Sequence, residues 1–225
     1  ALQVADGGNI TLFGKDVTVN SSLRSHGGSI AAGNVLNQIS ALGMLDTFVI
    51  PGGPAGKLLL ADGVSLDTSG LLANVLRDPL AAAGLPYING GSVSLRVLGD
   101  VRIGTGSRID VSSGAAILPQ AKQQGGKGGN LTLASHGAQA ELLLGEGAQV
   151  RGHGVAGGGK LELQANKILV GQADTAQKGT LQLGADFFDK GFSSYSLLGK
   201  QGLTVADGTQ VDVRMPVLRV VDNEK

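Results

Sequence analysis

Apolar and polar residues alternate in short stretches of this chain, and a tight turn follows many of these stretches. Strict alternation over a few residues predicts a half-buried β-strand, and the dipeptide Asp-Gly predicts a turn. An apolar alternating run, a turn residue, a glycine and a further apolar position follow one another at five places, with aspartate before the glycine in three of them: LQVADGGNI from Leu2, LLLADGVSL from Leu58, VRIGTGSRI from Val101, LLLGEGAQV from Leu142 and LTVADGTQV from Leu203. The glycine that these copies share can adopt the positive φ that such a turn requires. The five turn glycines are Gly7, Gly63, Gly106, Gly147 and Gly208.

A second pattern alternates with the first and consists of one or two glycines followed by a short strand. Its copies are GGSIAA from Gly27, GGSVSL from Gly90, GGNLTL from Gly128, GGKLEL from Gly158 and GTLQL from Gly179. A full cycle of both patterns is expected to take on the order of 20–30 residues, within the range of stacked repeats. An antiparallel sandwich and a parallel β-helix can both hold many short strands with tight turns.

The repetition favours the parallel β-helix. Stacked coils place like residues over like residues about 4.8 Å apart, whereas a sandwich pairs dissimilar neighbours. We therefore predict an all-β chain folded as a parallel β-helix, a single unit over residues 1–225. At roughly 25 residues per coil the chain would form about eight coils.

Two stretches interrupt the repeat and are predicted to be insertions, at residues 34–56 and 71–89. In the second, apolar residues follow near-helical spacing up to a proline at residue 79, which predicts a short helix or two. Insertions in repeat proteins collect on one face, and that face often binds a partner. An alternative is that these loops only cover a side of the rod.

The amino-acid composition argues against several classes of function and of site. The chain has 18 Lys+Arg and 18 Asp+Glu, a balance that argues against a nucleic-acid partner. It is 42% hydrophobic but only 3% aromatic, so its core must be aliphatic, and it has no cysteine for disulfides or metal sites. No apolar stretch approaches the roughly 18 residues of a membrane-spanning helix, so we expect no membrane insertion. The first residues lack a signal-peptide pattern, and we expect the chain to be a piece of a longer protein.

Candidate chemistry is sparse. RGHG from Arg151 contains a Gly-His-Gly seen in β-helical pectin-degrading hydrolases, but glycoside hydrolysis needs two carboxylates and the sequence has no Asp-Asp or Asn-x-Asp. GGKGGNLTL from Gly125 resembles a calcium-binding repeat, but it has Asn130 at the position where that repeat has aspartate. The three histidines (His26, His136 and His153) have no metal-ligand spacing. We therefore predict no catalytic residue, no metal site and no cofactor.

Aromatic residues outside the repeat are the candidates for binding. Tyr87 ends the second insertion, in the same segment as Arg77 and Asp78, and Phe192 and Tyr195 belong to the cluster DFFDKGFSSYS. Aromatic side chains can stack on sugars or anchor a protein partner. They can equally close the end of a hydrophobic core, so a structural role stays open for all of them.

The order of the motifs resembles the shafts of filamentous haemagglutinin-like adhesins, the large exoproteins of bacterial two-partner secretion. The resemblance rests on LDTSGLLANV, GLPYINGGSVSL, GTGSRIDVSSGA, GKGGNLTL and GADFFDKGFSSYSLLGKQGLTVADGTQVDV, and it covers nearly the whole chain. It implies a right-handed parallel β-helix, secretion to the bacterial cell surface, and a role in adhesion, aggregation or biofilm formation. The Asn-Pro-Asn-Leu motifs of the family's secretion domain are absent, so an outer-membrane transporter would recognise a region outside this chain.

Three functions are therefore carried forward. The first is a structural and adhesive rod segment whose partner is an extracellular polysaccharide or a host or cell-surface receptor. The second is a carbohydrate-binding module that uses the insertions and the aromatic cluster. The third is a polysaccharide-degrading enzyme, for which the sequence shows no pair of carboxylates.

Overall fold

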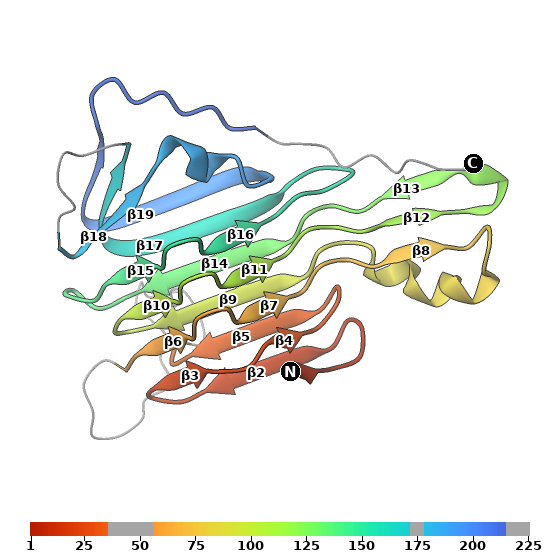
Figure 1. The fold of residues 1–225 in the computed structure, drawn as a ribbon, viewed down its shortest axis with the longest axis horizontal. Helices are drawn as coiled ribbons and strands as arrows, with labels where there is room; N and C mark the ends of the chain where they lie inside the picture. Colours follow the sequence, from red (N-terminus) through yellow and green to blue (C-terminus); the bar gives the residue numbers. More distant parts are fainter. Residues whose placement is uncertain (36–55, 172–177, 215–225) are drawn as a thin grey trace, which may run out of the picture.

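Strands are the main regular structure of the described chain and form four sheets (Figure 1). The computed structural model describes residues 1–35, 56–171 and 178–214. Most of the insertion predicted at residues 34–56 thus lies outside the described residues. Among the described strands, every pair of neighbours is parallel except β12 with β13.

Three of the sheets are wholly parallel. The five-stranded sheet contains β1 (Leu2–Gln3), β4 (Leu23–Arg24), β7 (Ser65–Asp67), β11 (Arg108–Asp110) and β16 (Gln149–Arg151). The four-stranded sheet contains β3 (Val17–Val19), β6 (Leu58–Leu60), β10 (Val101–Ile103) and β15 (Leu142–Leu144). The seven-stranded sheet contains β2 (Asn9–Phe13), β5 (Ser29–Gly33), β9 (Ser92–Val97), β14 (Asn130–Ser135), β17 (Gly159–Val170), β18 (Thr180–Leu183) and β19 (Phe192–Val205).

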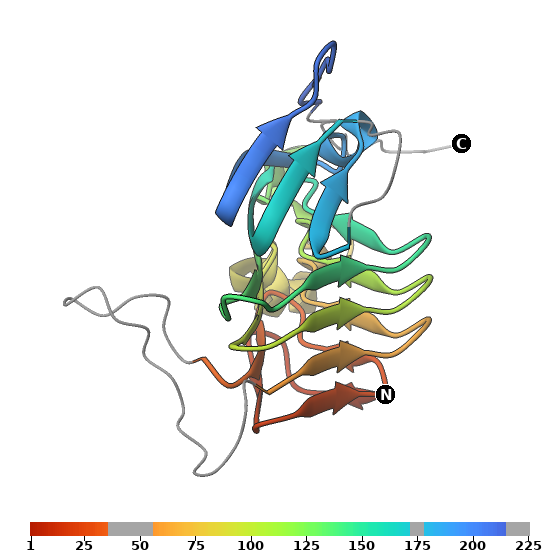
Figure 2. The same ribbon diagram turned by 90° about the vertical axis from the view of Figure 1, so that its left-hand side faces the viewer.

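From β3 to β17 the chain visits these sheets in a fixed order: the four-stranded, the five-stranded and then the seven-stranded sheet. We call one such passage a circuit. Figure 2 shows the circuits lying one above another. Each strand therefore hydrogen-bonds to the strand in the same place of the circuits before and after it, and contacts between residues far apart in sequence dominate the fold.

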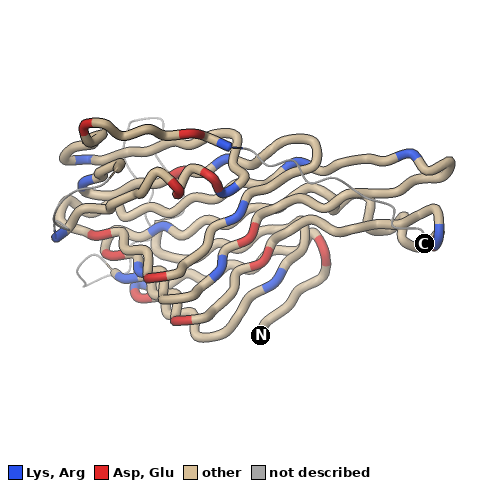
Figure 3. Tube along the Cα trace, turned by 45° about the horizontal axis from the view of Figure 1, so that its top comes forward, with Lys and Arg blue, Asp and Glu red and all other residues tan. Residues whose placement is uncertain are grey.

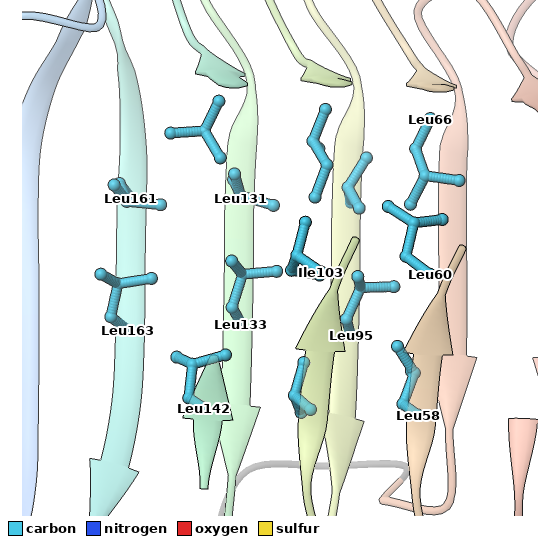
Figure 4. Close-up of a cluster of buried hydrophobic side chains, with 14 of the residues drawn as sticks. Leu58, Leu60, Leu66, Leu95, Ile103, Leu131, Leu133, Leu142, Leu161 and Leu163 are labelled. Atoms are coloured by element: carbon cyan, nitrogen blue, oxygen red, sulfur yellow. The ribbon is translucent and has the colours of Figure 1, made fainter. Parts of the chain in front are cut away.

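The core lies inside the circuits and is aliphatic, as predicted, except at its C-terminal end, where it includes Phe188 and Phe192. Inward positions of successive strands are register partners, so Leu58, Val101 and Leu142 form one column, and Leu66, Ile109 and Val150 form another. These side chains are at most 4% exposed. Figure 4 shows leucines and isoleucine from neighbouring circuits packed against each other in this interior. Burying each such side chain is worth roughly 1.5–3 kcal/mol.

The two sequence patterns correspond to two different places in a circuit. All five turn glycines have positive φ, between 65° and 73°, which confirms the predicted turns. Three copies of the first pattern, with its strand, turn residue and glycine, join the four-stranded to the five-stranded sheet, from β6 to β7, β10 to β11 and β15 to β16. All five copies of the glycine–strand pattern enter the seven-stranded sheet, as β5, β9, β14, β17 and β18.

The predicted cycle length is right for the first circuit and wrong for the next three. Register partners in the five-stranded sheet are Leu2, Leu23, Leu66, Ile109 and Val150, so successive circuits take 21, 43, 43 and 41 residues. The described chain therefore forms far fewer than eight circuits. The last two of these circuits carry described extra segments outside the three sheets, and the estimate of about eight circuits divided their residues among the repeats.

Two of these extra segments form a lateral lobe, which we define as residues 71–89 and 114–127. It holds the fourth sheet, in which β8 (Leu72–Asn74) pairs parallel with β12 (Ala115–Ile117), and β12 pairs antiparallel with β13 (Gln123–Gly125). The 3₁₀ helix η1 (Pro79–Tyr87) and a tight turn, labelled η2 (Pro119–Ala121), complete it. Figure 1 shows the lobe projecting beyond the ends of the three large sheets.

The short helix predicted in the second insertion begins later than its apolar spacing suggested. Leu72 to Asn74 form a strand, and the helix starts at Pro79. The reason is that β8 finds a parallel partner in β12, 43 residues further on, and this pairing overrides the local helical spacing. The hairpin of β12 and β13 was not predicted at all.

The regular stacking ends after the circuit that contains β17. The short helix η3 (Ala185–Phe188) and the long strand β19 follow β18. Leu203 and Val205 pair in parallel with Ile168 and Val170, as expected for stacked strands, and they do not pair with the residues after their own turn.

Candidate functional site

The charged residues are distributed over the body of the molecule with both signs interspersed (Figure 3). No helix among the described residues is long and apolar enough to cross a membrane. Within the same residues, no group of three or more histidine, aspartate or glutamate side chains could hold a metal ion. The candidate sites are therefore the surfaces that the sequence singled out and any hollow that the fold creates.

Arg77 and Asp78 lie in the exposed turn between β8 and η1. The backbone N–H of Arg77 donates to the Asn74 Oδ1 at 3.1 Å, and the Asp78 carboxylate accepts a hydrogen bond from the Leu80 N–H at 2.9 Å. Asp78 is thus the N-cap of η1 and has a structural role. Both side chains are exposed, so their predicted part in binding stays a prediction.

Tyr87 lies at the other end of η1, roughly 18 Å from Asp78 at about 2 Å per residue of 3₁₀ helix. Tyr87 is half-buried: its ring lies against Gly7, where an added Cβ would overlap the ring, and its Cβ and backbone lie close against Gly27. The two turns carry no side chain at these points, so the tyrosine can lie directly on them. Tyr87 connects the lateral lobe to the first circuits, and it does not share a site with Arg77.

The aromatic residues near the C-terminal end of the stack form one cluster. Phe188 and Tyr195 have ring centroids 5.1 Å apart, and Phe192 and Tyr195 meet edge to face at 5.9 Å. Phe192 is 0% exposed and covers the backbone of Gly152, and Phe188 is 5% exposed. A side chain buried this completely offers no surface to a ligand, so Phe192 belongs to the core rather than to a binding face. Tyr195 is half-buried beside it, and burial raises the pKa of its hydroxyl.

The structure thus separates the five predicted residues into three places. Arg77 and Asp78 lie together, Tyr87 lies apart from them, and Phe192 and Tyr195 lie together in the C-terminal cluster. No single surface contains all of them.

Stacking brings two carboxyl groups together that are far apart in sequence. Asp67 and Asp110 are register partners in the five-stranded sheet. The Asp67 Oδ1 accepts hydrogen bonds from the N–H and the hydroxyl of Ser69 at 3.0 and 2.6 Å. Burial opposes ionisation of Asp110, but hydrogen bonds from Arg108 and Ser112 outweigh it and lower the pKa of this carboxyl. Asp110 is therefore held ionised, which does not suit the protonated acid of a glycoside hydrolase.

The fold also creates a polar hollow that the sequence did not suggest, with a volume of about 650 Å³. It lies where the N-terminal end of β10, the turn before β15, the middle of β17 and β19 come together. Side chains that line it include Asp100, Arg102, Glu141, Asn166, Lys178 and Gln201. No pattern in the sequence could have identified it, because its residues come from five separate segments and none belongs to a recognisable motif.

Comparison with known proteins gives no independent indication of function. No family model, no curated protein and no solved structure matches the chain.

Proposed function

We propose that this chain is a shaft segment of a secreted, filamentous haemagglutinin-like bacterial exoprotein. In this proposal the parallel sheets are the faces of a right-handed parallel β-helix, and a region outside this chain guides export through an outer-membrane two-partner secretion transporter. The protein would act at the bacterial cell surface in adhesion, aggregation or biofilm formation. The observation that supports this best is the register of the parallel strands, which places each repeat motif over its counterpart in the next circuit.

The mechanism in this proposal is mechanical. Every circuit is joined to its neighbours by backbone hydrogen bonds in three sheets and by continuous aliphatic columns, so the stack resists bending. The lateral lobe projects from this stiff body and places Leu72 and Leu80, 82% and 84% exposed, away from the sheets. A receptor could reach the lobe without disturbing the stack.

A carbohydrate-binding module is the second candidate, and the polar hollow is the observation that favours it. A volume of about 650 Å³ lies within the usual range of ligand sites, roughly 300–1,000 Å³. A polysaccharide-degrading enzyme finds less support, because the one carboxyl pair discussed above is engaged in hydrogen bonds and ion pairs with Arg24 and Arg108.

Antibody labelling of the producing bacterium tests the proposal. Antibodies raised against this chain are expected to label intact cells and to reduce cell aggregation or biofilm mass, since the segment would be displayed on the surface. Labelling that requires permeabilised cells would contradict surface display. Surface labelling with no effect of the antibodies or of added soluble chain on aggregation would contradict the adhesive role.

A further inference from the structure

The polar hollow exists because the regular stacking stops beside it. β15 is the last strand of the four-stranded sheet. The next strand that could extend that sheet, β18, joins the seven-stranded sheet instead of pairing with β15. β17 runs on for 12 residues, and its second half pairs with β18 on one side and with β19 on the other. A space therefore opens between the segments that precede β10 and β15 and the middle of β17.

A β-bulge lies at the wall of the hollow. Ala165 pairs with Gly199 and Lys167 with Gly202, so Asn166 alone stands opposite Lys200 and Gln201. Lys200 donates hydrogen bonds to the carbonyls of His136 and Gly137, and the Gln201 Nε2 donates to the Ala138 carbonyl at 3.0 Å. Bulges commonly redirect side chains beside functional sites.

The lining is polar throughout: every residue that lines the hollow is charged, an amide or glycine. The Asp100 Oδ1 accepts from the Glu141 N–H at 3.0 Å, which fixes the turn that carries Glu141. Within the described part of the chain, no hydrogen bond or ion pair engages the side chains of Arg102, Lys167 and Lys178. Asn166 is only 7% exposed, and its Oδ1 has no hydrogen-bond partner in that same part of the chain.

We propose that the polar hollow binds an acidic oligosaccharide, a short chain of uronic-acid sugars. Amide and carboxylate side chains of the lining such as Gln139, Gln201 and Glu141 are suited to the many hydroxyl groups of a sugar. Three cations against two carboxylates leave the lining net positive, which favours a ligand that carries carboxylates. Apolar ligands are disfavoured because the hollow offers them no apolar side chain.

Lys167 and Lys178 have exposed side chains and would pair with the sugar carboxylates. Their charges are free to do so because neither is held by another side chain among the described residues. The inference supplies a ligand for the adhesive role proposed above and rests on it.

An NMR titration of the ¹⁵N-labelled chain with tri-galacturonate tests the inference, with maltotriose as the neutral trisaccharide for comparison. Tri-galacturonate is expected to shift the backbone amides of Glu141, Asn166 and Gln201 saturably. The double variant Lys167→Ala/Lys178→Ala should raise the Kd at least about tenfold. Lys122→Ala/Lys127→Ala is the matched control, because it removes the same charge from exposed lysines of the lateral lobe and should leave the Kd within about twofold.

Three results would overturn the inference: no saturable shifts with tri-galacturonate, equal binding of maltotriose, or an equal loss of affinity in the lobe variant. Unchanged spectra of both variants outside the substituted positions establish that they are folded. Antibody labelling and inhibition of aggregation are measured without galacturonate, so the adhesive proposal can survive when this inference fails.

Discussion

At the scale of single residues, a column of glycines sets how closely the circuits approach. Its members lie at the entry to the seven-stranded sheet in successive circuits. An added Cβ at every member after the first would overlap the carbonyl oxygen of the glycine in the circuit before it. The same carbonyl oxygens accept hydrogen bonds between circuits, for example from Asn130 N–H to Gly91 at 3.1 Å. The column consists of Gly8, Gly28, Gly91, Gly129 and Gly159.

Gly129→Ala is therefore expected to destabilise the chain strongly. The new methyl group would meet the backbone of Gly91, which cannot move without breaking a sheet, so we expect a loss of at least about 4 kcal/mol. Gly106→Ala is the matched control: nothing lies within 4 Å of the added Cβ, and only the positive φ of 65° opposes it, at about 1–2 kcal/mol. Urea unfolding measures both, and an equal loss in the two variants would contradict the close stacking.

His136 makes the stability depend on pH. It is 7% exposed, and burial, together with the nearby charges of Arg96 and Lys200, lowers its pKa to about 4. The unfolded state takes up the proton near pH 6.5, so the folded state loses up to about 3 kcal/mol of stability as the pH falls from above 6.5 toward 4.

His136→Gln removes this titration while keeping a polar side chain. Unfolding of the wild type and the variant is compared at pH 7.5 and pH 4.5, so that carboxylate effects common to both cancel. We expect a clearly smaller pH-dependent loss in the variant. Equal losses in the two proteins would show that His136 titrates normally in the folded state.

At the scale of elements, the lateral lobe depends on Tyr87 for its attachment to the first circuits. Tyr87→Ala should cost about 1–3 kcal/mol, because the ring covers the backbone of the turn at Gly7. The N–H group of Gly7, which donates to the carbonyl of His26, should then exchange hydrogen at least about tenfold faster. Tyr87→Phe keeps the ring and should behave as the wild type. If the alanine variant also exchanges at the wild-type rate, the ring of Tyr87 does not attach the lateral lobe to the first circuits.

The sequence predicts the strands and turns of this molecule well, because each is specified locally. Alternation identifies strands such as Leu58–Leu60, and the glycine after an acidic residue identifies the turn at Gly63. Lateral pairing is not local. Nothing near Leu72 indicates that Ala115 lies beside it, so the spacing there suggested a helix. The hairpin beyond Ala115 turns at Gln120, a non-glycine residue with a φ of 65° that carries no turn signal.

The candidate site was less predictable than the fold. Aromatic residues are rare in this chain, which makes them candidates for binding. Phe192, however, is buried and fills the core, so it has a structural role. The polar hollow depends on where the stacking ends and on a bulge at Asn166. Neither the end of the stacking nor the bulge can be predicted from a local sequence pattern, because Gln201 and Lys178 look like ordinary surface residues in the sequence.

At the scale of the whole molecule, the protein consists of parallel circuits whose inner columns are continuous and whose outer surface varies. The lateral lobe and the polar hollow both lie where a circuit departs from the common pattern. The shared part of each circuit builds the body, and the departures supply its distinctive surfaces. All of these features depend on one arrangement, the in-register parallel stacking of residues from successive circuits.

Disulfide trapping tests that stacking most directly, because the chain has no cysteine of its own. Leu59 and Arg102 are register partners on the outer face of the four-stranded sheet, so the pair Leu59→Cys/Arg102→Cys should oxidise to an intramolecular disulfide with the circular dichroism unchanged. The pair Lys57→Cys/Arg102→Cys is shifted by two residues, about 7–8 Å across the ladder, which is too far for a disulfide, and it should stay reduced. Oxidation of the shifted pair as readily as the in-register pair, or of neither, would contradict the stacked parallel circuits.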